Sequence, residues 1–536
     1  MKRIALFATC FIVATTFAQS KKFTFKLGTE YELPRKSEDL SFIGNAEDGI
    51  VNLSLKKDEL TLLRFDYKTL NQTNEKVIPL DEKTRNFNSE TFVDFKGKYF
   101  WLHSDWDKDA ETEYLYYDKV DIKKGAIIET NKKLISATKI AGEGAVATTS
   151  MFQMWTQKAT NKYKFNYDAD ESKILVSYRL KPEEKNDKKN YDKLGMFVFD
   201  ETMSKLWGGE FTMPYTEAIM DNSDFSVDSK GNAYLLSKVY DSEKRKEKDK
   251  ETGKAGYHYE VLKFTKDSKQ VLHSSLDVGD FFIRDASLVE NSLHEMIITC
   301  TYSKKAKGTG TDGVFLAIMD QAGKISKYKN GYYEFPLEEL TKFESARSKR
   351  KMEKKGDYEA PNLKVRNLIV EKDGGVFIDL EEYWIEEQTY YNNGHTTTTY
   401  IYHYENIVVS KIKADGTFAW VRKIPKMQKG YSGRGTMGYT LVSDASGYYF
   451  LYLDNKKNME LEEDEAPKYH QDGFGGQVVV TKIDNAGVMT KEIVFDTREE
   501  EVMIFPANFK KINGNQFVGR AKVKRGDFKP LLITVN

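Results

Sequence analysis

The chain has 536 residues, 40% of them hydrophobic and 13% aromatic, which is enough apolar material for a large folded core. Lysine plus arginine and aspartate plus glutamate number 82 each, so the formal net charge is zero. This balance excludes the domain-wide basic surface on which nucleic-acid-binding proteins depend.

The first residues have the three-part composition of a secretory signal. Lys2 and Arg3 precede an apolar run over residues 4–14, and small and polar residues lead to Ala18. We expect residues 1–18 to be a signal peptide, removed on export to the periplasm or to the outside of the cell. The apolar run is shorter than the roughly 20 residues that a membrane-spanning helix needs, which argues against a retained anchor and leaves no transmembrane segment.

The two cysteines cannot form a disulfide in a mature chain, because Cys10 lies within the expected signal. Cys300 lies in an apolar stretch over residues 295–302. We expect it to be a small buried hydrophobe rather than a nucleophile.

Pairs of short apolar strands joined by polar, glycine-bearing turns recur along the rest of the chain. The clearest copy spans residues 227–236, with its turn at Lys230-Gly231, and a second hairpin follows at residues 261–272. Two consecutive hairpins make one four-stranded antiparallel sheet. Eight such modules can be recognised, opening near residues 42, 91, 164, 227, 286, 368, 441 and 508.

The two ends of the chain are complementary. The last module lacks its fourth strand, and the strand predicted over residues 23–33 has no neighbouring partner. Pairing the two would close a ring and remove the exposed edges of an open array. The sequence therefore predicts an all-β fold over residues 19–536, a single β-propeller of eight four-stranded blades closed by the N-terminal strand, with seven blades as the alternative.

This repeat pattern resembles the β-propeller superfamily over essentially the whole mature chain. The segment at residues 415–420, Asp-Gly-Thr-Phe-Ala-Trp, is similar to the strand-end signature of some quinoprotein-type propeller repeats, but it occurs in one module only. The signature of WD repeats and the Asp boxes of sialidases are missing. No particular family's functional residues can therefore be transferred to this chain.

Long insertions are expected on one face of the ring only. In a propeller, the turns after the first and third strands of each blade point to one face, and those turns are tight in this sequence. The other face receives the long segments, of which the largest are residues 138–160, 336–361, 386–404 and 455–477. We call it the elaborated face, and we expect binding there because loops on a rigid scaffold commonly carry function.

One of these insertions predicts a helix. Residues 337–355 carry apolar side chains at three-residue steps among charged ones, which is typical of an amphipathic helix lying across the ring. The basic run at residues 347–351 would attract an anion, or it would simply complement the helix dipole.

The insertion of the sixth module predicts an aromatic ribbon. Asn393-Gly394 is a strong type I′ turn signal, and pairing outward from it sets Tyr391 opposite Thr396 and Tyr383 opposite Tyr404. Either the ribbon continues the blade and packs between blades, or it is a contact surface for protein or glycan. Strand alternation places Tyr383, Ile385, Tyr400, Tyr402 and Tyr404 on one side and Trp384, Ile401 and His403 on the other.

A second candidate site lies where chain segments enter the innermost strands. Mixed carboxylates and guanidiniums at the mouth of a central channel could bind a polar ligand or act as acid and base. Channel mouths are also polar simply because they are wet. The residues at these positions are Glu90, Asp224, Arg284, Asp285, Arg366, Asn367 and Asn508.

Other motifs support no cofactor or metal. Residues 105–111 have carboxylates at alternate positions but lack the glycine of a calcium loop, so a solvated acidic loop is favoured, as for residues 460–465. The seven histidines show no zinc-ligand spacing. The glycine motifs at residues 142–147 and 433–438 do not open helices after strands, so they lack a phosphate-binding context.

Two functions remain open. The first is a secreted, non-enzymatic binding or scaffold protein whose elaborated face contacts protein or glycan. The alternative is a hydrolase or lyase that acts at the channel mouth on a polysaccharide or another polar polymer.

Overall fold

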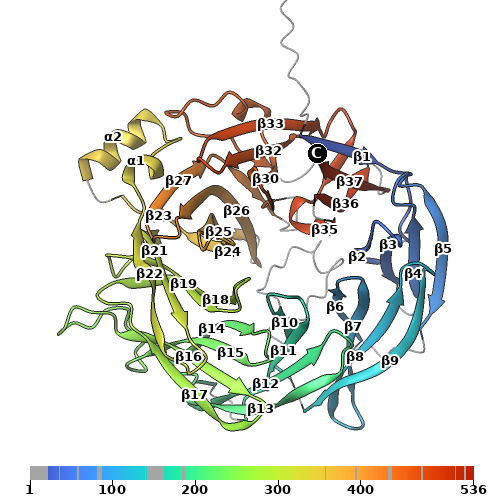
Figure 1. The fold of residues 1–536 in the computed structure, drawn as a ribbon, viewed down its shortest axis with the longest axis horizontal. Helices are drawn as coiled ribbons and strands as arrows, with labels where there is room; N and C mark the ends of the chain where they lie inside the picture. The colour runs from blue at the N-terminus through green and yellow to red at the C-terminus, as the bar shows by residue number, and fades with distance from the viewer. Residues whose placement is uncertain are drawn as a thin grey trace, which may run out of the picture.

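The computed structural model describes residues 22–34, 37–56, 59–80, 87–138, 140–141, 162–183, 187–355, 358–392, 395–431, 437–471, 475–513, 515–523 and 527–536. The expected signal peptide, the Asn393-Gly394 turn and most of both glycine motifs lie outside these residues. In the described part of the chain, eight sheets of four or more strands, antiparallel except for one short pair, stand radially around a common centre (Figure 1). This confirms the predicted all-β propeller.

The first four blades each contain four strands, which follow one another from the centre of the ring outwards. Blade one contains β2 (Glu38–Asn45), β3 (Gly49–Lys56), β4 (Glu59–Phe65) and β5 (Gln72–Pro79). Blade two contains β6 (Asn88–Phe95), β7 (Lys98–Asp107), β8 (Thr112–Asp121) and β9 (Ala126–Ala137). Blade three contains β10 (Tyr163–Tyr167), β11 (Lys173–Arg179), β12 (Tyr191–Asp200) and β13 (Lys205–Thr216). Blade four contains β14 (Met220–Val227), β15 (Ala233–Tyr240), β16 (Tyr257–Thr265) and β17 (Ser268–Leu276).

The remaining blades follow the same order, with additions in blades six and eight. Blade five contains β18 (Phe282–Glu290), β19 (Met296–Ser303), β21 (Gly313–Met319) and β22 (Ile325–Glu334). Blade six contains β24 (Leu363–Val370), β25 (Val376–Asn392), β26 (His395–Ile412) and β27 (Phe418–Ile424), extended by β28 (Gln428–Gly430) and β31 (His470–Gln471). Blade seven contains β29 (Thr440–Asp444), β30 (Gly447–Asp454), β32 (Gln477–Asp484) and β33 (Met489–Asp496). Blade eight contains β34 (Val502–Ile504), β35 (Lys510–Asn513), β36 (Gln516–Val523), β37 (Phe528–Val535) and β1 (Phe23–Leu27).

A few short elements decorate this frame. A two-stranded pair joins β20 (Gly310–Thr311) to β23 (Ala360–Pro361). Three 3₁₀ turns, η1 (Asp187–Lys189), η2 (Lys456–Asn458) and η3 (Pro506–Asn508), lie in connections. No helix in the described part of the chain is long and apolar enough to cross a membrane.

The ring closes by pairing the two ends of the chain, as the sequence predicts. Strand β1 runs antiparallel to β37 from the Phe23 and Val535 pair to the Leu27 and Leu531 pair, and so forms the outer strand of blade eight. The Phe23 ring then packs against Tyr449 of blade seven, with ring centroids 5.4 Å apart. The N-terminal strand is therefore a structural part of the ring.

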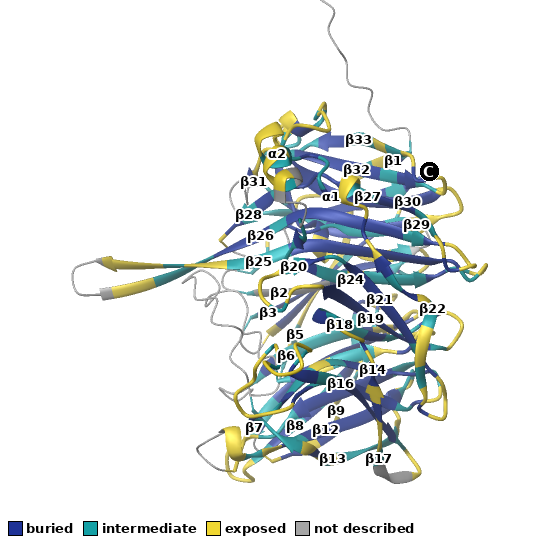
Figure 2. Cartoon of the chain, turned by 90° about the vertical axis from the view of Figure 1, so that its left-hand side faces the viewer, coloured by how far each residue is buried: buried dark blue, intermediate teal, exposed yellow. Residues whose placement is uncertain are grey.

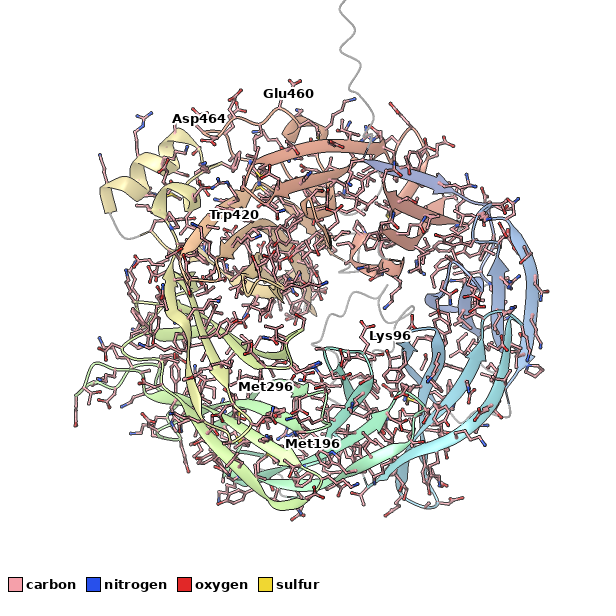
Figure 3. The ribbon with its side chains drawn as sticks, in the orientation of Figure 1. Lys96, Met196, Met296, Trp420, Glu460 and Asp464 are labelled. Atoms are coloured by element: carbon pink, nitrogen blue, oxygen red, sulfur yellow. The ribbon has the colours of Figure 1, made fainter. Side chains whose placement is uncertain are left out.

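The hydrophobic core is divided among the junctions between blades. Eight buried clusters can be distinguished in the described residues, and each joins apolar side chains of two neighbouring blades. Trp420 is an example, because it lies on the outer strand of blade six (Figure 3) and its indole Nε1 donates to Asn485 O of blade seven at 3.2 Å. Every blade thus depends on both neighbours for burial.

The tight turns on the face opposite the elaborated face follow from local side-chain chemistry. In the turn between β14 and β15, Asp228 Oδ1 accepts hydrogen bonds from Lys230 N at 3.0 Å and Asn232 N at 2.8 Å. Gly231 has φ = 82°, a left-handed conformation that strains other residues. An aspartate followed three residues later by glycine therefore specifies this turn.

The prediction of one helix over residues 337–355 is wrong. The segment forms two helices, α1 (Leu337–Leu340) and α2 (Ala346–Lys355), at the outer edge of the ring beside blade six (Figure 1). The break occurs because Phe343 adopts a left-handed φ of 58° and its N–H donates to Glu463 O at 2.7 Å. A tertiary contact thus overrides the helical periodicity.

Candidate functional site

Except for Asn508, the residues predicted at the channel mouth lie within the innermost strands, at or next to a recurring irregularity. Strands β2, β6, β14, β18 and β24 each contain a register shift that leaves one residue without a partner on the next strand. Glu90, Arg284 and Arg366 stand at these register shifts, and Asp285 and Asn367 directly follow two of them. β-bulges of this kind re-aim side chains and occur near functional sites.

Two of the predicted carboxylates connect adjacent blades. Asp224 of blade four accepts hydrogen bonds from Ser287 Oγ at 2.8 Å and Leu288 N at 2.9 Å in blade five. Asp285 of blade five accepts from Val365 N of blade six at 3.2 Å and pairs with Lys364 Nζ at 3.0 Å. Burial raises the pKa of Asp224, and these donors partly offset that rise. Both carboxylates therefore hold neighbouring innermost strands together.

Two other predicted residues form hydrogen bonds within their own blades. Glu90 Oε1 accepts from Ser104 Oγ at 2.5 Å. The Arg284 guanidinium donates to the carbonyls of Ala306 at 3.2 Å and Gly310 at 3.3 Å, and so supports the loop before β21. Asn508 ends the turn η3 before β35.

Blade six contains a buried ion cluster that the sequence analysis only partly anticipates. Arg366 donates to Glu381 Oε2, at 2.9 Å from Nε and 2.8 Å from Nη2. Lys426 is fully buried, lies 2.8 Å from Glu381 Oε1 and donates to Tyr404 O at 3.0 Å. Burial lowers the pKa of Lys426, while Glu381 acts in the opposite direction. Two cations thus share one buried carboxylate.

Two further buried carboxyls lie in the same blade. Asp379 accepts from Asn367 N at 2.8 Å and Asn367 Nδ2 at 3.0 Å, and burial raises its pKa to about 7. Glu382 accepts from Asn406 Nδ2 at 2.9 Å, and burial raises its pKa to about 7 as well. Acidic side chains are rarely buried to this degree without a specific role in structure or function.

The ribbon of blade six has the predicted register. Strands β25 and β26 pair Tyr391 with Thr396, Glu387 with Tyr400 and Tyr383 with Tyr404. The Tyr383 and Tyr404 rings lie 4.8 Å apart on one side of the ribbon. The tight turn signal and strand alternation were therefore sufficient to assign both sides.

The base of the ribbon packs as part of the blade. His403 stacks on Trp384 with ring centroids 4.4 Å apart and planes at 7°. Its Nε2 lies 3.1 Å from Glu386 Oε2 and its Nδ1 lies 3.3 Å from Glu405 Oε1. Tyr469 OH donates to Glu405 at 3.0 Å and thereby links the ribbon to the insertion before β32.

Additional strands support the same base. β28 pairs with β26 at Tyr402, His403 and Tyr404, and β31 pairs in parallel with β28. Ile401, Tyr402 and His403 are buried as a result. The base of the ribbon therefore fits the interpretation that the ribbon continues the blade.

The outer half of the ribbon is different, because it extends well beyond the ring (Figure 2). The side chains of Tyr390 and Tyr391 are 54% and 78% exposed. Thr396 and Thr397, which pair with them, are exposed too. The ribbon therefore presents aromatic and hydroxyl groups to solvent on a base fixed by buried contacts.

The acidic motifs have local structural partners. Asp107 Oδ1 accepts from Asp109 N and Ala110 N, both at 3.0 Å, and so shapes its own turn. Glu460 and Asp464 lie at the outer edge of the ring (Figure 3). Between them, Glu463 pairs with Lys342 at 3.2 Å and accepts from Lys349 Nζ through its carbonyl at 2.9 Å, so the acidic run contacts the basic helical segment.

Glu381, Glu382 and Lys426 were missed by the sequence analysis. The first two lie in β25 between apolar residues that read as an ordinary strand, and Lys426 lies in a connection. Two adjacent glutamates inside an otherwise buried strand were the available signal, since burial requires each to have a partner.

No protein-family model matches the chain, and no curated protein matches it in sequence. Similar solved structures include a polysaccharide lyase, at 10% identity over 84% of this chain and 90% of the lyase, with a TM-score of 0.38. A sialidase from Streptococcus pneumoniae matches at 9% identity over 96% of this chain and 95% of its own, with a TM-score of 0.32. An acylaminoacyl peptidase from Pyrococcus horikoshii matches at 11% identity over 91% of this chain but 58% of the peptidase, with a TM-score of 0.33.

Proposed function

We propose that this chain is an exported, non-enzymatic binding protein that contacts a protein partner through the outer half of the β25/β26 ribbon. Two observations carry the proposal: the β25/β26 ribbon extends beyond the ring from a rigidly held base (Figure 2), and Tyr390 and Tyr391, near the end of β25, are exposed. Exposed tyrosines of this kind have no role in the core, and tyrosine gives a large contact area at low entropic cost.

The rigidity of the base supports a binding role. The Trp384 and His403 stack, the pairing of β28 with β26 and the Glu405 contact to Tyr469 fix the direction in which the ribbon extends. A preorganised element loses less conformational entropy on binding than a flexible loop does. The described outer part of the ribbon therefore needs to lose little conformational entropy when a partner binds.

Strand edges indicate the class of partner. Among the described residues, β24 pairs with β25 only as far as Glu382, and β28 pairs with β26 only as far as Tyr402. Beyond these points both outer edges of the ribbon carry backbone N–H and C=O groups that an extended peptide could pair with. This favours a protein partner over a glycan, which has no such ladder to add.

The contacts of the predicted channel-mouth carboxylates favour binding over hydrolysis. Asp224 and Asp285 both accept hydrogen bonds from backbone amides of the next blade. Carboxylates held by such hydrogen bonds suit a structural role better than the role of a general acid or base, which needs an accessible carboxyl group. On this proposal, the tyrosines of the ribbon base stabilise the ribbon and are not part of a catalytic centre. They are Tyr383, Tyr400, Tyr402 and Tyr404.

The proposal is tested by changing the tip and leaving the base intact. The variant Tyr390→Ser/Tyr391→Ser and a second variant with residues 388–399 replaced by a short turn should both fold, because none of the described residues that they alter belongs to the core. Affinity capture from the native envelope fraction, quantified by mass spectrometry, should show a set of proteins bound by the wild type and lost from both variants.

A matched control is Tyr191→Ser, since Tyr191 on blade three is exposed to nearly the same extent as Tyr390 (53% against 54%). This variant should retain all the proteins bound by the wild type. Capture that is the same for wild type and tip variants would refute the proposal. A wild-type chain that bound glycans on an array through the same tyrosines would instead assign the tip to carbohydrate.

A further inference from the structure

A cavity of about 350 Å³ lies between blades three and four, separate from the ribbon. It is bordered by the end of β11, the start of β12, the start of β14 and the link before β14, which all belong to the elaborated face. A water molecule takes up about 30 Å³ of liquid volume, so the cavity has room for roughly a dozen non-hydrogen atoms. This is the size of one sugar ring with its substituents. Its lining includes Lys164, Ser177, Arg179, Asp192, Asn222 and Phe225.

Strand register brings the lining groups together. Ser177 of β11 lies opposite Lys164 of β10 and Met196 of β12, so the three side chains share the side of blade three that faces blade four. Met196 lies within blade three (Figure 3) and belongs to the apolar cluster that also contains Phe225 of β14. The lining therefore combines apolar and polar side chains, as small-molecule sites commonly do.

Most charged side chains of the lining form ion pairs. Arg179 Nε donates to Asp192 Oδ1 at 2.6 Å, and its Nη2 lies 3.1 Å from Glu217. Lys162, which is in the lining, pairs at 2.9 Å with Glu113, which is not. Asp221, also in the lining, pairs with Arg245 at 2.7 Å.

Lys164 is the exception. Among the described residues it has no carboxylate within ion-pair distance, and its Nζ stands over the Phe225 ring at 5.2 Å from the centroid. The carboxylate whose charge it influences is Asp224, which is already bound to Ser287 and Leu288. The lining therefore carries one positive charge that has no carboxylate at ion-pair distance among the described residues.

Two polar atoms at the cavity also lack partners in the described part of the chain. They are the hydroxyl of Ser177, a residue that is 1% exposed, and Oδ1 of Asn222, whose Nδ2 donates to Asp192 at 3.2 Å. Polar groups buried without hydrogen bonds are destabilising, so native proteins usually satisfy them. A ligand with hydroxyl groups could satisfy both.

We propose that this cavity binds a monosaccharide-sized polyol that carries one anionic group. Lys164 pairs with the anion, Asn222 and Ser177 bind hydroxyl groups, and Phe225 contacts the apolar face of the ring. The balanced charges of Arg179 and Asp192 hold the walls in place. The proposal is independent of the ribbon, since no residue is shared between the two sites.

Isothermal titration of the full chain with glucuronate, galacturonate, glucose phosphate and neutral glucose tests the proposal. At least one anionic sugar should bind, and Lys164→Gln should weaken it about tenfold, as expected for one charge-assisted contact. Because Lys164 is exposed, this variant should keep the fold, which its melting temperature will check. Comparing the two uronates with glucose phosphate shows whether the site prefers a carboxylate or a phosphate as the anionic group.

The matched control is Lys205→Gln on the outer strand of the same blade, where Lys205 Nζ lies 4.5 Å from the Phe197 ring centroid. This variant should bind like the wild type. The proposal is overturned if no anionic sugar binds at concentrations up to about 10 mM, or if Lys164→Gln leaves the affinity unchanged. It is also overturned if inorganic phosphate alone competes as strongly as the sugar, since the site would then be a simple anion site.

Discussion

Replacing Phe23 with alanine tests ring closure without removing a backbone hydrogen bond. The Phe23 side chain is 2% exposed and lies in the cluster that joins blades seven and eight, against Tyr449. Truncating a buried phenylalanine to alanine typically costs about 3–5 kcal/mol of unfolding free energy. We expect a loss in this range, because the surrounding strands cannot collapse into the space left behind.

The expected shift in melting temperature follows from the size of the ring. Unfolding entropy is about 2 cal/mol/K per residue, so roughly 500 residues that unfold as one unit give about 1 kcal/mol/K. A loss of about 3–5 kcal/mol should therefore lower the melting temperature by about 3–5 °C. Differential scanning calorimetry would measure this shift.

Thr24→Ala is the matched control, since Thr24 is exposed on the same strand. It should melt within about 1 °C of the wild type, because surface substitutions away from specific features change stability little. Deleting residues 23–33 should lower the melting temperature further, as the five strand pairs with β37 are lost as well. A Phe23→Ala chain that melts with Thr24→Ala would show that β1 is not needed to close the ring.

Two further predictions concern buried groups. Burial holds the pKa of Asp379 at about 7, against about 3.9 in an unfolded chain, so the native state binds a proton that the unfolded state has lost and stability falls as pH rises through this window. Between about pH 5 and pH 8, the melting temperature of Asp379→Asn should therefore fall by less than that of the wild type. Some fall should remain in the variant, because the pKa of Glu382 is raised in the same direction. An equal fall in both proteins would contradict the raised pKa of Asp379. Cys300 is fully buried, and burial raises the pKa of its thiol, so a thiol reagent should label it only as fast as the chain unfolds, with Cys300→Ser as the blank. Rapid labelling of the folded protein would show that blade five opens.

Local chemistry determined much of this structure from the sequence. The turn at Lys230-Gly231, the period-two alternation around it and the register outward from Asn393-Gly394 depend on residues close together in the chain, so they could be predicted. The partnership of β1 with β37 could be predicted as well, because an unpaired strand at one end and a missing strand at the other leave one simple solution.

Tertiary structure alone decided what lies between blades. Phe343 interrupts a helical pattern because of one contact to Glu463, a residue 120 positions away in the chain. Asp224 and Asp285 have the side chains of catalytic candidates, but backbone amides of the next blade occupy them. Lys426 pairs with Glu381 within blade six, and Lys164 and Ser177 of blade three meet Asn222 of blade four at the cavity between the two blades. Partners of buried charges are set by neighbours distant in sequence, and no local pattern encodes them.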